Sequence, residues 1–156
     1  MKNYVEIFSS LLTPLIAILS VCIAWQQYQI NHSSLRNALY ERRLKVFNAF
    51  MSFLTDTVRQ GWSDHQRVMQ FYGETSEAVF LFDAKVVDKA EELYNQGIEL
   101  DFLHEQLDPC DGGPGLPIGS ERNRVVQEQI ALRRWFVEQI KEVRELFKKQ
   151  MQVKVR

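Results

Sequence analysis

The residues best suited to chemistry lie in one short stretch, "DFLHEQLDPCD" (residues 101–111). Asp101, His104 and Asp108 are spaced three and four residues apart, so on a helix they would share one face. Cys110 follows directly. Carboxylate, imidazole and thiolate groups are zinc ligands, which makes Asp101, His104 and Cys110 the candidate metal site. The competing and favoured interpretation is the solvated face of a helix end, so we expect no metal and no other cofactor.

A second candidate is the glycine-rich loop "GGPGLPIGS" (residues 112–120), which leads into a predicted helix. Backbone N–H groups at the start of a helix favour anions, but the loop lacks the lysine of a phosphate-binding P-loop. A turn is the favoured interpretation, and an anion-binding loop is the alternative. The chain has no G-x-S-x-G motif or other catalytic constellation, so we expect a protein without enzymatic activity.

The bulk composition narrows the class further. The 156 residues include 19 basic and 20 acidic side chains, and the pI is near 6.3. A nucleic-acid binder usually shows a basic excess, so no nucleic-acid partner is expected. The two cysteines, Cys22 and Cys110, lie in unlike settings, which argues against a disulfide framework.

The elements that must position these residues begin with an apolar segment at Ile7–Trp25, "IFSSLLTPLIAILSVCIAW". As a helix it would measure about 28 Å, close to the ~30 Å hydrocarbon thickness of a bilayer. Asp, Glu, Lys and Arg are absent from Ile7 to Leu35. The segment predicts a retained membrane anchor. A cleaved signal peptide is the alternative, but Glu6 and the missing A-x-A site disfavour it.

The flanks of this segment fit the same prediction. Tyr4 lies at one edge, and Trp25 and Tyr28 lie at the other, where aromatic rings prefer the lipid headgroups. Lys2 is the only basic side chain before the segment. Four basic residues follow it closely, which by the positive-inside rule places the C-terminal part in the cytoplasm: Arg36, Arg42, Arg43 and Lys45.

The rest of the chain predicts helices. Apolar residues recur at spacings of three and four over residues 35–58, 86–107 and 126–151. The predicted fold is all-α: a transmembrane anchor at residues 1–27 continues without a linker into a cytosolic bundle at residues 28–156. This bundle has three long antiparallel arms, the middle one broken near residues 73–83, with four to five helices in all and a loop at residues 108–120. Up-down-up order would place that loop near the membrane and the C-terminus at the far end.

The helix after the anchor has more apolar positions than one narrow seam needs. Leu39, Val46, Phe50 and Phe53 are therefore a candidate interaction face. Two interpretations stay open: these side chains form the core of the bundle, or part of them meets a second copy of the chain.

Three segments carry a resemblance to a known group: Ala24–Phe50, Thr75–Asp83 and Arg133–Gln139. The chain resembles a loose family of uncharacterised short bacterial single-span membrane proteins, in which an aromatic-Gln-x-Tyr segment ends the span and a Tyr-Asp/Glu-x-Arg motif follows. The resemblance implies a bacterial origin, an N-terminal anchor and a cytosolic helical domain. It transfers no catalytic residue.

Together these observations predict a single-pass protein of the bacterial inner membrane whose N-terminus lies outside and whose bundle is cytoplasmic. The expected partners are membrane lipid and either a second copy or another protein, and the expected function is interaction or self-assembly. One alternative is a membrane-perturbing effector, for example in phage defence. A metal-dependent enzyme is a further, disfavoured alternative.

Overall fold

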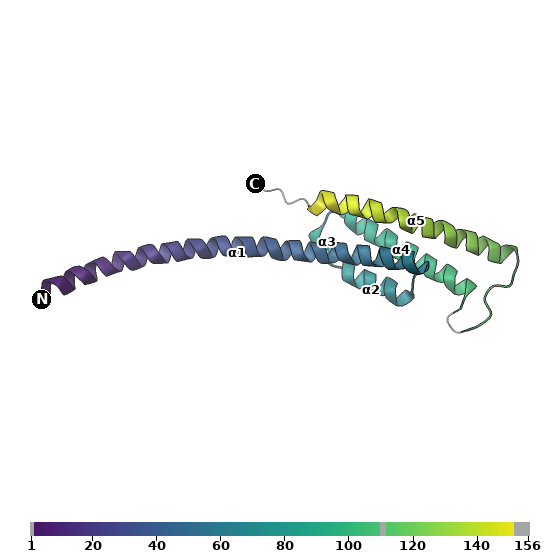
Figure 1. Ribbon diagram of the computed structural model, residues 1–156, viewed down its shortest axis with the longest axis horizontal. Helices are drawn as coiled ribbons and strands as arrows, with labels where there is room; N and C mark the ends of the chain where they lie inside the picture. The colour runs from purple at the N-terminus through teal and green to yellow at the C-terminus, as the bar shows by residue number, and fades with distance from the viewer. Residues whose placement is uncertain (1, 110–111, 152–156) are drawn as a thin grey trace. The chain divides into compact units, whose positions relative to one another are not determined.

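The computed structural model contains five helices and no strand among its described residues, which are 2–109 and 112–151. Side chains are not described for residues 2–13, 15, 29–33 and 35. The helices follow in chain order (Figure 1): α1 (Lys2–Gln60), α2 (His65–Thr75), α3 (Ala78–Leu81), α4 (Ala84–Leu107) and α5 (Ser120–Met151). The all-α prediction is confirmed. The chain divides into two units, Met1–Tyr40 and Glu41–Arg156.

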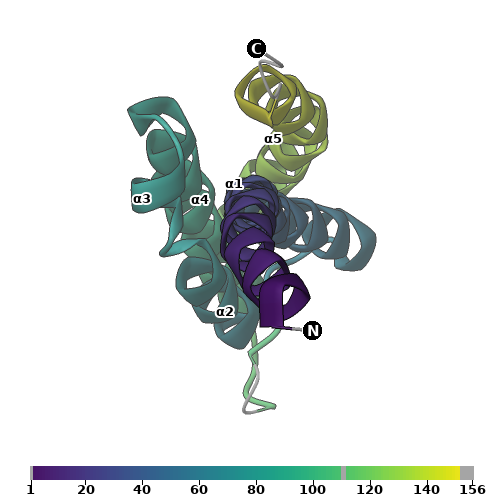
Figure 2. The same ribbon diagram turned by 90° about the vertical axis from the view of Figure 1, so that its left-hand side faces the viewer.

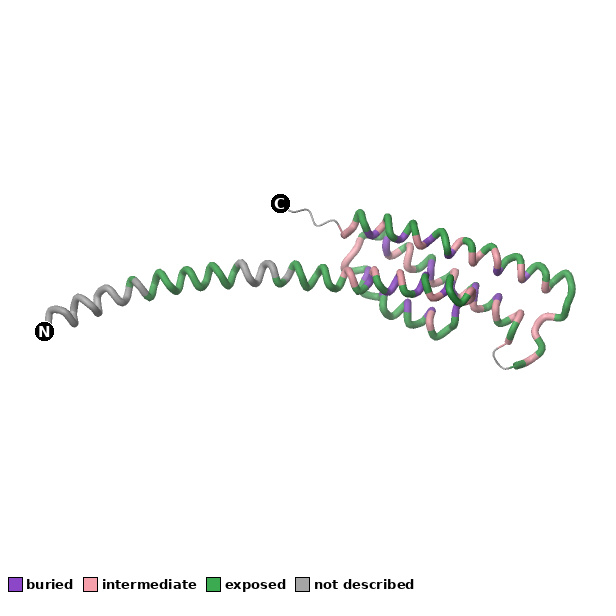
Figure 3. Tube along the Cα trace, in the orientation of Figure 1, coloured by how far each residue is buried: buried purple, intermediate pink, exposed green. Residues whose placement is uncertain are grey.

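The first unit is the N-terminal part of α1. This helix continues through Pro14 and through the "NHSS" segment without interruption. The described side chains of this unit are exposed, as the green segments in Figure 3 show.

The second unit is an up-down-up-down bundle of four helices, α1, α2, α4 and α5, as both ribbon views show (Figures 1 and 2). Contacts between distant residues fix the directions. Phe50 and Phe53 of α1 both pack on Phe71 of α2. Phe147 near the end of α5 packs on Phe50, whereas Phe136 packs on Phe53, so α5 runs antiparallel to α1.

This topology corrects the three-arm prediction. The predicted middle arm is two antiparallel helices, because the chain reverses direction between Ser76 and Asp83 through the one-turn helix α3. As a result, the C-terminal end of α5 lies beside the start of the bundle: the Arg43 guanidinium donates to the Gln150 carbonyl at 3.4 Å. The loop at residues 108–120 lies at the opposite end, the reverse of the predicted placement.

The core is built mainly from phenylalanine and branched aliphatic side chains. Phe53 stacks on Phe71 with ring centroids 4.4 Å apart, and Phe50 meets Phe71 edge-on at 5.2 Å. Such aromatic pairs add about 0.5–1.5 kcal/mol beyond the area that they bury. The other large, fully buried side chains come from all four helices: Val46, Leu54, Val68, Val86, Leu93, Leu100, Val125, Phe136, Val143 and Phe147.

Two glycines shape this arrangement. Gly61 ends α1 with φ +78°, a left-handed conformation that glycine adopts without strain, and its N–H donates to the Thr57 carbonyl at 2.8 Å. Gly97 lies buried within α4, where a Cβ atom would come 2.9 Å from Phe53 Cζ and 3.2 Å from Val68 Cγ2. The absence of a side chain at Gly97 therefore leaves room for the side chains of Phe53 from α1 and Val68 from α2.

Candidate interaction surfaces

The candidate metal ligands are used for other contacts where the structure describes them. Asp101 Oδ2 lies 3.6 Å from His65 Nδ1, and the His104 ring stacks on Trp62 with centroids 4.5 Å apart. Cys110 lies outside the described residues. Among the described residues, no group of three or more His, Cys, Asp or Glu side chains is close enough to hold a metal ion.

The Asp101 carboxyl lies between α2 and α4. Burial raises its pKa above the ordinary value, and the charges of Asp64 and Glu105 act in the same direction. His65 and His104 act in the opposite direction and offset this only in part. The Asp101–His65 contact therefore links α4 to the start of α2.

The loop that follows α4 folds back on the end of that helix. The Leu116 N–H donates to the Gln106 carbonyl at 2.9 Å, and Arg122 Nη1 donates to the Leu116 carbonyl at 2.7 Å. A Cβ atom at Gly115 would come within 2.2 Å of the Leu107 carbonyl oxygen, so glycine permits the close approach. In its described residues the loop thus acts as a C-terminal cap for α4, as the turn interpretation expects.

The predicted interaction face divides in the structure. Val46, Phe50 and Phe53 are 1, 0 and 2% exposed and belong to the core of a single chain. They are therefore not a surface of that chain, and the core interpretation applies to them. Leu39 is 49% exposed and keeps its place as a candidate contact residue.

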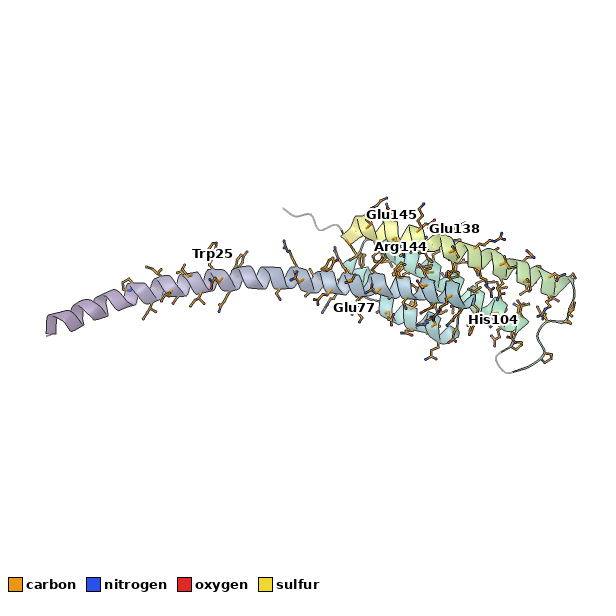
Figure 4. The ribbon with its side chains drawn as sticks, viewed as in Figure 1. Trp25, Glu77, His104, Glu138, Arg144 and Glu145 are labelled. Carbon is orange, nitrogen blue, oxygen red and sulfur yellow. The ribbon has the colours of Figure 1, made fainter. Side chains whose placement is uncertain are left out.

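The predicted membrane-interface residues lie on α1. Trp25 and Tyr28 are exposed, and Figure 4 marks Trp25 on this helix. The side chain of Tyr4 lies outside the described residues, as do all of those from Ile7 to Thr13. Within the part of the chain that the structure describes, no helix holds a stretch both long and apolar enough to cross a membrane.

The bundle carries an apolar surface groove that sequence reasoning missed. A groove of about 250 Å³ lies between the end of α2, α3 and the start of α4. Apolar and small side chains make up most of its lining: Tyr72, Thr75, Ser76, Ala78, Val79, Val87, Ala90 and Glu91. Next to it, Phe80 is 87% exposed and Val79 is 57% exposed.

The signal for this surface was present in the run "AVFLF" at residues 78–82. A one-turn helix of consecutive apolar residues cannot direct all of them to one side, because successive positions differ by 100°. Ala78 is buried, and Leu81 and Phe82 pack against the core. Val79 and Phe80 are left to face outward. We refer to the groove together with Val79 and Phe80 as the α3 surface.

Carboxylates surround the α3 surface. Glu91 lines the groove, and Glu77 directly precedes α3. Within the described part of the chain, neither forms an ion pair. From Asp64 to Asp101 the chain holds nine acidic and three basic residues. Two of the three basic side chains are paired, Arg67 with Asp56 at 2.6 Å and Lys89 with Glu92 at 2.6 Å.

Basic residues flank Leu39 on α1. The segment Arg36–Lys45 holds four basic residues and one acidic residue, and Leu39 and Tyr40 are 49 and 45% exposed. We refer to this segment as the α1 basic segment. The α1 basic segment is basic, whereas the α3 surface is bordered by carboxylates. Both surfaces also expose apolar side chains. The two surfaces are therefore complementary in charge.

Comparisons of the chain with family models, with curated proteins and with solved structures give no match.

Proposed function

We propose that this chain is a single-pass protein of the bacterial inner membrane whose bundle binds a protein partner or a second copy on the cytoplasmic side, without catalysis. In this proposal the segment Ile7–Trp25 is the anchor, and residues 28–156 form the cytosolic interaction module. The resemblance to short bacterial single-span proteins supports the same assignment.

The observation that carries the proposal is the exposure of large apolar side chains around more than half of the circumference of α1. Five of them are 52–69% exposed: Ile16, Ile18, Leu19, Val21 and Ile23. Because successive helix positions differ by about 100°, the remaining arc of the helix holds the small residues Ala17, Ser20 and Ala24. Burial of one such side chain is worth about 1.5–3 kcal/mol. The sum is of order 10 kcal/mol, comparable to the stability of a whole domain, so a lipid or protein environment for this segment is strongly favoured.

Charge supports the orientation. Lys2 is the only basic side chain before the segment, and Arg36 is the first of four that follow it. The positive-inside rule then favours a cytoplasmic bundle and an external N-terminus.

A fractionation experiment tests the anchor. Membranes containing the intact chain are washed with alkaline carbonate, which removes peripheral proteins, and we expect the chain in the pellet. In the double variant Ile18→Lys/Val21→Lys, each lysine adds about 2.5–3.5 kcal/mol at the centre of a membrane helix, and we expect release. The control Val79→Lys changes an exposed apolar residue of the bundle and should stay in the pellet. Recovery of the unmodified chain in the supernatant would contradict the anchor.

A second measurement tests the interaction role. Amine-reactive crosslinking of the intact chain in membranes should produce one discrete larger species, either a homo-oligomer or a complex with one reproducible partner. A monomer under all crosslinking conditions would contradict the role while leaving the anchor in place.

A further inference from the structure

The α3 surface exposes Phe80 and Val79 beside a groove lined by Glu91, which forms no ion pair within the described part of the chain. Exposed apolar groups rimmed by polar residues commonly mark binding sites. The groove volume of about 250 Å³ lies below the ~300–1,000 Å³ of typical small-molecule sites. It suits a few side chains of a protein segment better than a metabolite.

We propose that the α3 surface of one chain binds the α1 basic segment of a second copy. Leu39 and Tyr40 of that copy pack on Val79 and Phe80, and its basic side chains face Glu77 and Glu91. This inference rests on the proposed function, because it assumes that both copies are anchored in one membrane.

Charge complementarity supports this contact. Glu77 and Glu91 have no ion-pair partner within the described residues, and the flanking basic residues Arg36, Arg42 and Lys45 likewise form no ion pair there. Placing these basic side chains beside Glu77 and Glu91 lets them form ion pairs between the two copies. Complementary charge mainly increases the association rate and selects the partner, whereas the apolar contact supplies affinity.

Anchoring also makes a small contact sufficient. Stable interfaces between freely diffusing proteins bury about 1,200–2,000 Å². Two chains held in one membrane meet at a raised effective concentration, which strengthens a weak contact without additional area.

Disulfide crosslinking between two differently tagged chains tests the proposal in membranes. Both chains carry Cys22→Ser and Cys110→Ser; one carries Leu39→Cys and the other Val79→Cys. Mild oxidation should join the two chains, because a disulfide requires Cα atoms about 4.4–6.8 Å apart. The matched control replaces Val79→Cys by Val137→Cys, a valine on α5 that is 53% exposed. We expect at least about tenfold less product with the control.

Charge reversal separates specific contact from random collision. Glu77→Arg/Glu91→Arg in the Val79→Cys chain should reduce the crosslinked product about tenfold, which corresponds to about 1.4 kcal/mol. Arg36→Glu/Arg42→Glu in the Leu39→Cys chain should restore it. Equal crosslinking at Val79→Cys and Val137→Cys, or failure of the second reversal to restore the product, would overturn the proposal.

The outcome also distinguishes this inference from the proposed function. If amine-reactive crosslinking shows a discrete complex but the Leu39→Cys and Val79→Cys chains do not join, the contact proposed here is wrong and the interaction role stands. If both experiments show only monomers, both are wrong.

Discussion

At the scale of single residues, Gly97 shows how the structure changes the meaning of a sequence signal. A glycine within a helix costs up to about 1 kcal/mol relative to alanine, and from sequence alone it marks a weak point in the helix at residues 84–107. In the bundle the same residue is buried, and its missing Cβ leaves room for Phe53 and Val68. Packing outweighs propensity at this position.

We therefore predict that Gly97→Ala destabilises the bundle. Added volume in a filled core typically costs about 1–3 kcal/mol, which exceeds the gain in helix propensity. Urea denaturation of the full chain in detergent, followed by circular dichroism, measures the change.

Gly73 in α2 is the matched control, because a Cβ there would meet nothing within 4 Å. Gly73→Ala should raise the free energy of unfolding by up to about 1 kcal/mol. If Gly97→Ala were as stable as Gly73→Ala, the packing of Phe53 and Val68 against Gly97 would be wrong.

At the scale of helices, Lys89 joins α4 to α5. Its Nζ donates to Gln139 Oε1 at 2.9 Å and lies 3.2 Å from a carboxylate oxygen of Glu142, both on α5. Partial burial alone lowers the Lys89 pKa, but hydrogen bonds to Glu92 and Glu142 outweigh it and the pKa is raised. Gln139 is 2% exposed, so its carbonyl has little access to water.

We predict that Lys89→Ala reduces stability by about 1–3 kcal/mol, the usual cost of leaving a buried polar group unpaired. Thermal unfolding of the full chain in detergent measures it. Lys85→Ala removes an exposed lysine of the same helix and should change stability by less than about 0.5 kcal/mol. Equal effects of the two substitutions would show that the link between α4 and α5 contributes nothing.

The helices themselves were largely predictable, and their directions were not. Apolar spacing indicated the long helices, because burial on one face requires a regular repeat. The reversal between Ser76 and Asp83 carries no glycine or proline. It depends on Phe82, which leaves the helical conformation (φ −135°, ψ 169°) while its ring packs against Phe147. The direction of the chain after such a turn is fixed by tertiary contacts, so the sequence indicated a break near residues 73–83 but not the reversal.

The interaction surfaces were also only partly predictable from the sequence. Spacing identified Phe50 and Phe53 as apolar helix positions but could not distinguish a core from a contact between copies, since both need the same pattern. Val79 and Phe80 were visible as part of an apolar run. Their exposure became clear only from the direction in which α3 lies on the bundle.

At the scale of the whole molecule, the proposed anchor can be tested through the environment of Cys22. In the isolated chain Cys22 is a free, exposed cysteine. A membrane span would cover it with lipid, so a water-soluble maleimide should not label it in intact membranes but should label it after the membranes are dissolved in detergent. The chain used carries Cys110→Ser, so that only Cys22 reacts.

The control for this labelling is Ile118→Cys in a chain with both native cysteines replaced by serine. Ile118 is 98% exposed on the loop before α5, so it should react in membrane vesicles whose cytoplasmic face is outward. Equal labelling of Cys22 and Ile118→Cys in intact vesicles would exclude a lipid environment for Cys22.

The contact between Arg43 and Gln150 has a practical consequence for anyone attaching a reporter to this protein. Because α5 finishes beside the point where α1 joins the bundle, a fluorescent protein fused after Met151 would sit close to the α3 surface and could block it. The turn around Ile118, at the opposite end, offers a position for an inserted epitope or dye that leaves this region clear.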